Sequence, residues 1–241
     1  MSSKKLIVVV AIVAVVIAGA AAVAFSSTPT NATELKSGNA NNDPNASRNQ
    51  QIIEQLKTVT VASAPALGSA DAKVTIVEFG DYQCTWCHRW HQSTKDAVLA
   101  DFVDTGKVRF LFKDFAINDQ ADRASSLAAE ASYCAGDQGK YWDYHDELYN
   151  NWEGENTGWV TKDSLKQFAS NVGLDLSQFT ECLDSGTHSD LVKQNYNLAV
   201  SAGLSATPSF IVLVDGETPK LIRGAHPYDT FKQVIDPVYA G

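Results

Sequence analysis

Two cysteines separated by two residues, in the segment C-T-W-C at residues 84–87, are the part of this chain whose spacing points most directly to chemistry. Residues 73–80, K-V-T-I-V-E-F-G, have the pattern of a short strand, and apolar residues at helical spacing then continue to Gly106. Cys84 is therefore expected at a helix N-terminus, where free N–H groups lower the pKa of a thiol. The spacing predicts that Cys84 is the attacking thiolate and that Cys87, one turn deeper, resolves the mixed disulfide.

The C-x-x-C pattern also begins other kinds of site, and two of them stay open as alternatives. With His88 the chain contains C-x-x-C-H, the string that attaches c-type haem. The surrounding α/β order argues against haem, as does the lack of any methionine other than Met1 for axial ligation. A zinc site that added His91 would crowd its ligands compared with ordinary zinc spacings. For both histidines we expect a partly exposed position on the helix surface.

The elements that position the motif alternate between strands and helices. After the motif we predict a strand over 107–112, a helical stretch over 117–203, strands over 209–214 and 219–222, and a helix over 228–239. The strongest helical patterns inside that stretch cover 121–135, 141–149 and 163–172. A β-α-β unit followed by a hairpin and a helix predicts a small mixed α/β sheet flanked by helices.

An uninterrupted apolar run over residues 6–25 follows Lys4 and Lys5. A helix of this length is about 30 Å long, which matches the thickness of a bilayer core. We expect residues 1–25 to form a cytoplasmic start and a single transmembrane helix, with the catalytic domain outside the cytoplasm. A signal peptide cleaved after the A-V-A at residues 22–24 is the alternative, and either reading exports the rest of the chain.

Residues 26–57 are rich in Ser, Thr and Asn and predict a flexible linker, with a short helix over 50–57. The sequons at Asn31 and Asn45 leave glycosylation open. Residues 58–241 are expected to form the folded domain.

The composition excludes several classes of protein. An apolar content of 44% is enough for a packed core, and a net charge of −9 is a poor match for nucleic acid. The chain has no phosphate-binding glycine loop and no G-x-S-x-G elbow. We expect no cofactor, no metal and no nucleic-acid partner.

The string E-F-x-D-Y-x-C-x-x-C, followed by a helical insert and by T-P before a strand, resembles the DsbA-like family of thiol–disulfide oxidoreductases, in its membrane-anchored form. The resemblance covers about 58–241. It implies a thioredoxin-like fold with an inserted helical domain over about 117–203, preceded by a single transmembrane helix. It also implies disulfide formation or exchange in exported proteins that carry thiols. The implied partner is a quinone-linked membrane re-oxidase, DsbB-like or vitamin K epoxide reductase-like. A thioredoxin-like reductase remains the alternative.

The resemblance assigns roles to individual positions. Cys84 and Cys87 match the redox pair, and Thr207 with Pro208 matches the cis-proline loop that faces this pair. Glu78 matches the buried acid that accepts the proton of the buried thiol. The alternatives are an ordinary trans turn at Pro208 and an exposed strand position for Glu78.

Two further positions bear on the redox chemistry. Lys113 is a looser match to a basic residue that neighbours the buried acid. Strong oxidants of the family often carry a histidine between the two cysteines, whereas this chain has Thr85 and Trp86 there. The redox potential is therefore left open by the sequence.

Cys134 and Cys182 remain once the local pair is assigned, out of three pairings that four cysteines allow. We expect them to form a structural disulfide inside the helical insert, worth about 4 kcal/mol by loop closure. Two unpaired buried thiols are the alternative.

Overall fold

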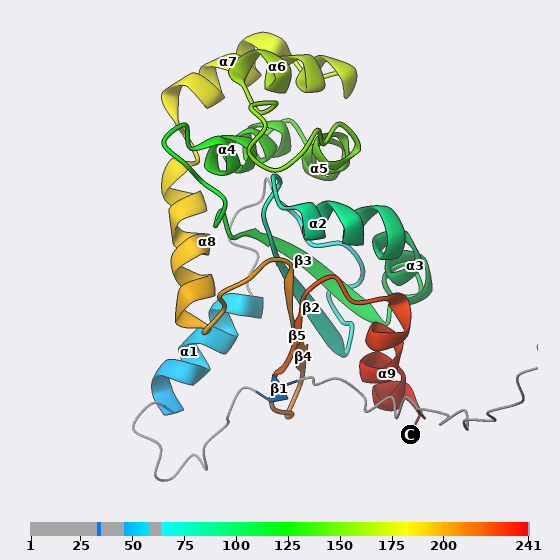
Figure 1. The fold of residues 1–241 in the computed structure, drawn as a ribbon. Coiled ribbons are helices and arrows are strands. Elements are labelled where there is room, and N and C mark those ends of the chain that lie inside the picture. Colours follow the sequence, from blue (N-terminus) through cyan, green and yellow to red (C-terminus); the bar gives the residue numbers. More distant parts are fainter. Residues whose placement is uncertain (1–32, 35–45, 58–63, 241) are drawn as a thin grey trace, which may run out of the picture. The chain divides into compact units, whose positions relative to one another are not determined.

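A computed structural model describes residues 33–34, 46–57 and 64–240, and a five-stranded sheet organises this part of the chain (Figure 1). The strands are β1 (Thr33–Glu34), β2 (Val74–Gly80), β3 (Val108–Asp114), β4 (Ser209–Val214) and β5 (Lys220–Arg223). Their spatial order is β1-β5-β4-β2-β3, with β2 and β3 parallel and every other pair antiparallel. The central strands are buried on both faces, which explains their continuous apolar runs.

The helix that follows the C-x-x-C motif is long and locally widened. It begins as α2 (Thr85–Trp90), passes through a π-helical turn (His91–Lys95), continues as α3 (Asp96–Val98) and ends in a second π-helical turn (Leu99–Val103). Gly106 follows with a φ of +74°, a conformation that glycine adopts easily. The structure thus confirms a helical segment between the motif and Gly106, and we call it the redox helix.

Helices cover both faces of the sheet. On one face, Trp90 of the redox helix packs with Phe110 of β3, Phe210 of β4 and Phe231 of α9 (Tyr228–Tyr239). On the other face, α1 (Ala46–Lys57) and α8 (Ser189–Ser201) pack against a separate apolar cluster, which includes Leu56. The sheet is therefore the middle layer of an α/β arrangement.

The helical insert lies between β3 and β4 and has its own core. It contains α4 (Ala124–Gly136), α5 (Tyr141–Asn150), α6 (Lys162–Asn171) and α7 (Leu176–Ser185), and α8 returns the chain to the sheet. Figure 1 places α4 and α5 beyond the end of the sheet at which the redox helix starts. Small residues on α4 allow close packing, so that almost the whole helix is buried. The insert is consequently placed to contribute side chains to the C-x-x-C motif.

The predicted α/β order with an inserted helical domain is confirmed, although several boundaries differ. Strand β4 and the closing helix α9 match their predicted ranges, and α9 continues through Pro237 without a break. The predicted linker includes α1, which begins at Ala46, and Leu56 of that helix is fully buried. None of the helices in the described ranges is long and apolar enough to cross a membrane. The predicted anchor over 6–25 and the sequons at Asn31 and Asn45 lie outside these ranges.

Candidate active site

Cys84 is the N-cap of the redox helix, directly after β2 and a short turn. Its backbone is extended, with φ −67° and ψ 123°, and the helix begins at Thr85. The Cys84 Sγ lies 3.5 Å from the carbonyl oxygen of Thr207, and only 5% of the residue is exposed. Gly80, the last residue of β2, allows the Phe112 ring to pack closely there, because a Cβ atom would lie 2.5 Å from that ring.

Asp81 fixes the turn between β2 and the redox helix. Its carboxylate accepts hydrogen bonds from the backbone N–H groups of Gln83 and Asn118, both at 2.8 Å, and its carbonyl accepts one from Cys84 N–H at 3.0 Å. Burial raises the pKa of Asp81 to about 6, against the opposing effect of the two N–H bonds. The sequence string contains this aspartate, but the sequence pattern assigned it no role.

The two cysteines of the motif lie in different electrostatic environments. The pKa of Cys84 is lowered to about 7, chiefly by a hydrogen bond from the Cys87 thiol, which outweighs the opposing effect of burial. Hydrogen bonds from the N–H groups of Cys87 and Trp86 lower it further. Cys87 is 1% exposed, and burial raises its pKa well above the ordinary value. Near neutral pH the site can therefore present one thiolate, on Cys84.

Glu78 is buried on the face of β2 that carries the redox helix. Burial raises its pKa to about 8, while the nearby Lys95 ammonium opposes this shift and the Cys84 thiolate adds to it. The expectation that Lys113 is the basic residue next to Glu78 is wrong. Lys113 pairs in register with Phe79, one residue beyond Glu78, so that strand alternation directs it to the opposite face of the sheet. The cation near the acid is Lys95, from the first π-helical turn.

Lys95 belongs to a cluster of polar side chains between the redox helix and α5. Its ammonium lies 2.5 Å from the Asp146 carboxylate, which also bonds to His91 Nε2 at 3.0 Å. His145 is fully buried beside them and bonds through Nδ1 to the Tyr82 hydroxyl at 3.0 Å. The expected partly exposed position of His91 is therefore wrong, because α5 covers that side of the redox helix and leaves the residue buried, at 8% exposure.

The residues of the cis-proline loop lie next to the motif. The Thr207–Pro208 peptide bond is cis, and β4 begins at Ser209, which pairs with Phe79 at the end of β2. This pairing places the Thr207 carbonyl beside Cys84. The Thr207 hydroxyl is buried and has no hydrogen-bond partner among the described residues.

The insert also contacts the motif through the loop over residues 151–161, which joins α5 to α6 and which we call the insert loop. The Trp152 indole donates to the carbonyl of Gln83 at 3.0 Å and stacks on the His88 ring at 4.5 Å. The His88 Nδ1 in turn bonds to the carbonyl of Tyr149 at 3.0 Å. His88 is thus half-buried, as expected, and is held by the insert.

These contacts do not fit haem or zinc at the C-x-x-C-H string. Haem attachment needs both cysteines and the histidine on one open side of the chain, whereas Cys87 is buried and Trp152 covers the His88 ring. A zinc site is equally poorly supported, because His88 and His91 bond in different directions, to the carbonyl of Tyr149 and to Asp146.

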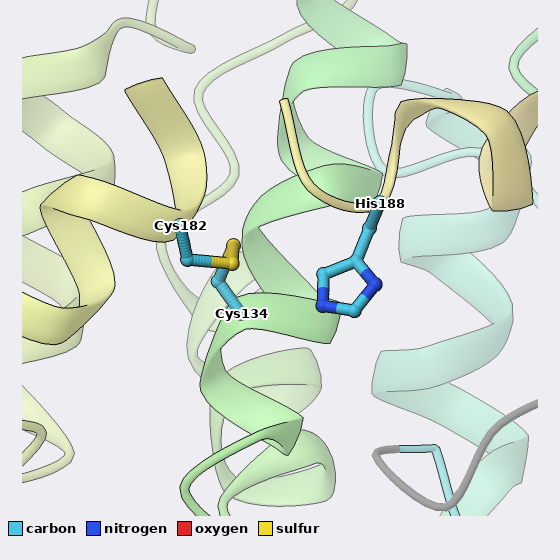
Figure 2. Close-up of side chains that lie close together, drawn as sticks. All are labelled: Cys134, Cys182 and His188. Atoms are coloured by element: carbon cyan, nitrogen blue, oxygen red, sulfur yellow. A yellow bond between two sulfur atoms is a disulfide. The ribbon is translucent and has the colours of Figure 1, made fainter. Parts of the chain in front are cut away.

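Cys134 of α4 and Cys182 of α7 are joined by a disulfide, with their Cα atoms 5.8 Å apart. Figure 2 shows the His188 ring beside this bond, and its Nε2 lies 2.7 Å from the Asp137 carboxylate. The bond joins two helices of the insert away from the redox helix. Its cysteines are committed to each other and are not available as metal ligands in this form.

Comparisons with known proteins agree with this site. A family model described as thioredoxin matches residues 60–237. Disulfide bond formation protein D of Bacillus subtilis is 30% identical over 183 residues, which cover 76% of this chain and 80% of that protein. The chain belongs to the thioredoxin family, as a DsbA-like disulfide oxidoreductase. Two solved structures are similar to it. Oxidised BdbD from Bacillus subtilis gives a TM-score of 0.66 at 30% identity, covering 74% of this chain and 94% of that chain. Wolbachia pipientis α-DsbA1 shares the fold, with a TM-score of 0.65 at 22% identity over 74% and 92% of the two chains.

In this DsbA-like oxidoreductase, the arrangement supplies what thiol–disulfide exchange requires. Cys84 offers the sulfur of lower pKa, and Cys87 lies within bonding reach in the next turn. A buried carboxyl with a pKa near neutrality, Glu78, lies close to both sulfurs and can exchange a proton with the buried one. The sequence motifs indicated these residues, whereas Asp81, Lys95, Asp146 and Trp152 emerge only from the fold.

Proposed function

We propose that this protein is an exported, membrane-anchored oxidase that introduces disulfides into secreted or surface proteins through Cys84 and Cys87. The observation that carries the proposal is the difference between the two sulfurs, since Cys84 has a pKa of about 7 and Cys87 a strongly raised one. A stabilised thiolate favours the dithiol form of the enzyme, and a protein whose dithiol form is favoured is an oxidant in its disulfide form.

In the oxidative direction, a substrate thiolate attacks the Cys84 sulfur of the Cys84–Cys87 disulfide. The sulfur–sulfur bond of the enzyme breaks, and Cys87 leaves as a thiolate that takes a proton from Glu78. A second substrate thiolate then attacks the substrate sulfur of the mixed disulfide and releases Cys84 as a thiolate. Two electrons pass to the enzyme, and the substrate gains one disulfide.

Thr207 and Pro208 are proposed to receive the substrate beside Cys84. Two residues after Cys84, the Trp86 side chain is half-exposed and lies under the Arg89 guanidinium at 4.6 Å. An aromatic and a cationic group of this kind can contact an extended peptide without selecting one sequence. This arrangement supports a broad range of exported protein substrates.

The oxidising strength is expected to be intermediate. Thr85 and Trp86 supply no cation to the Cys84 thiolate, unlike a histidine at either position. We expect a potential above the approximately −270 mV of thioredoxin and below the approximately −120 mV of the strongest oxidant. A thioredoxin-like reductase is the alternative function, and the potential separates the two.

Export and anchoring are supported by the apolar run over 6–25 and its two preceding lysines. An anchored oxidase needs an acceptor for its two electrons. We propose a quinone-linked membrane re-oxidase, DsbB-like or vitamin K epoxide reductase-like, as that acceptor. Anchoring can be tested by mass measurement of the protein in the membrane fraction, which is expected to retain residues 1–25. A soluble protein that begins near Phe25 would contradict it.

Equilibration of the full chain with reduced and oxidised glutathione tests the direction. The expected result is a potential between the two limits above, together with an oxidised Cys84–Cys87 pair in intact cells. A potential at or below that of thioredoxin, or a pair that is reduced in cells, would replace the oxidase with the reductase.

A further inference from the structure

The insert loop holds the residues on both sides of Cys84. On one side, the Trp152 indole donates to the carbonyl of Gln83. On the other side, the Glu155 carboxylate accepts hydrogen bonds from the Thr85 backbone N–H at 3.2 Å and from the Thr85 hydroxyl at 3.3 Å. A carboxylate of the insert is therefore fixed one residue away from the reactive sulfur.

This carboxylate and the Cys84 thiolate bond to neighbouring N–H groups at the start of the redox helix. The first turn of the redox helix has N–H groups with no partner inside the helix. Thr85 N–H goes to Glu155, whereas the N–H groups of Trp86 and Cys87 interact with the Cys84 sulfur. Two anionic groups thus occupy adjacent N–H donors of one helix turn when the enzyme is in its dithiol form.

We propose that Glu155 lowers the oxidising strength of the Cys84–Cys87 pair by placing a negative charge beside the Cys84 thiolate. The inference rests on the proposed function of that pair. In the disulfide form Cys84 is neutral, and Glu155 interacts with Thr85 at no electrostatic cost. Reduction by two thiols of glutathione yields the dithiol enzyme and one glutathione disulfide, and Cys84 then ionises next to a like charge. The repulsion disfavours the reduced form and so makes the enzyme disulfide a weaker oxidant.

Other ionisable groups also face Cys84 and must be separated from this effect. Cys87 is on its own helix, Glu78 is on β2, and Tyr149 is on α5. All of them are at least partly buried, and their positions do not depend on a Glu155 contact. Glu155 is exposed, so added salt is expected to weaken its influence on Cys84. Salt screens the interactions of the buried groups with Cys84 much less.

Glu155→Gln is the decisive variant, because its amide oxygen can still accept from Thr85 while the charge is gone. Glu153→Gln is the matched control, since it removes the same charge from the same loop and the Glu153 carboxylate makes no hydrogen bond or ion pair with a described residue. Two measurements on the full-length protein are compared: the glutathione equilibrium constant, and the Cys84 pKa from the ultraviolet absorbance of its thiolate.

With Glu155→Gln we expect the pKa of Cys84 to fall by about half a unit. The glutathione equilibrium at pH 7 should shift about twofold toward the dithiol enzyme, because Cys84 is only partly ionised at that pH. The pKa change is the size of a water-screened interaction between neighbouring unit charges. Glu153→Gln should leave both quantities unchanged, and high salt should reduce the difference between Glu155→Gln and the wild type.

An unchanged or raised Cys84 pKa in Glu155→Gln would overturn the proposal. So would a change in Glu155→Ala that Glu155→Gln does not reproduce, because the role would then be one of position and not of charge. The absorbance titration needs no exchange with glutathione. The titration therefore decides the role of Glu155 even if the Cys84–Cys87 pair fails to equilibrate with glutathione. Such a failure would count against the proposed function and not against the role of Glu155.

Discussion

The Lys95 ammonium lies 2.5 Å from the Asp146 carboxylate, and this ion pair joins the redox helix to the inserted helix α5. Lys95 is 4% exposed, and an ammonium buried to this degree requires a partner. His91 bonds to the same carboxylate, and Glu78 lies within electrostatic reach of Lys95. The insert thus takes part in the charge balance beneath the reactive cysteines.

Replacing Asp146 with Asn is expected to lower the free energy of unfolding by about 1–3 kcal/mol at pH 7, because Lys95 stays buried without its counter-charge. This expected loss is smaller than the loss for a fully buried ion pair, because Asp146 is partly exposed to solvent. Asp96→Asn is the control, since Asp96 also contacts Lys95, at 3.8 Å, but its side chain is 93% exposed. Denaturant unfolding of both variants measures the difference. Equal effects of the two substitutions would contradict the importance of the buried pair.

The same pair predicts a pH dependence. Partial burial opposes ionisation of Asp146, but the bonds from His91 and Lys95 outweigh it and hold the pKa of Asp146 below its ordinary value of 3.8. An acid with a lowered pKa in the folded state contributes stability above its unfolded pKa and loses it as the pH falls further. The difference between wild type and Asp146→Asn should therefore narrow below about pH 4. A constant difference down to pH 2 would count against this reading.

Glu78→Gln is expected to stabilise the protein at neutral pH. Burial raises the pKa of Glu78 to about 8 from 4.5, so that the folded state holds a proton that the unfolded state releases. Stability from this proton is present below the unfolded pKa and is lost progressively as the pH rises through 8. The variant should gain on the order of 2–3 kcal/mol over the wild type at pH 7 and nothing at pH 4. The variant should also slow the step in which Cys87 leaves the enzyme disulfide, because the proton that Glu78 supplies to it is missing. Thermal unfolding at the two pH values measures the first effect, and a stability gain that is the same at both would rule out the raised pKa as its cause.

Cys87→Ser is expected to accumulate mixed disulfides between Cys84 and cellular proteins, because the attacking sulfur remains and the resolving one is gone. Cys84→Ser should accumulate almost none, since Cys87 is buried and its pKa is strongly raised. Non-reducing gels followed by mass spectrometry identify the adducts. If Cys84→Ser were the variant that traps substrates, the roles of the two cysteines would be reversed.

The double variant Cys134→Ser, Cys182→Ser is expected to lose up to about 4 kcal/mol of stability, as loop closure over a separation of 48 residues predicts. It should keep most of its oxidoreductase activity at low temperature, because the bond lies inside the insert and away from the redox helix. Unfolding and insulin-reduction assays on the same preparation separate the two properties. Loss of activity with unchanged stability would instead assign the pair a role in electron transfer.

Local patterns were sufficient for much of the fold. Strands with continuous Val and Ile runs and helices with a marked apolar face were found within a few residues of their true ends. The packing of α1 against the core was not predicted, because a helix with one fully buried apolar residue, Leu56, has too weak an apolar pattern in the sequence. The widening of the redox helix by two π-helical turns leaves no trace in the apolar spacing either.

The site was predictable only where its residues are close in sequence. Cys84, Cys87 and Glu78 lie within one strand-to-helix unit, so that their spacing carried the information. Glu155 and Asp146 reach the motif from the insert, more than 50 residues away, and no local pattern marks them. The errors at Lys113 and His91 have a similar origin, because the face of a strand depends on its register and the burial of a helix depends on what covers it.

Strand β4 lies at the centre of the sheet beside β2, although its residues follow the whole insert in the chain. Val74 pairs with Val214, and Phe79 pairs with Ser209. During synthesis, Cys84 is therefore made long before Thr207, the residue whose carbonyl contacts its sulfur. The Cys84 thiol therefore stays uncovered until nearly the whole chain has been translated, because β4 cannot pair with β2 before β4 has been made. The first strand made after the insert is thus the one that encloses the reactive sulfur, and selective chemistry begins only when the polypeptide is almost complete.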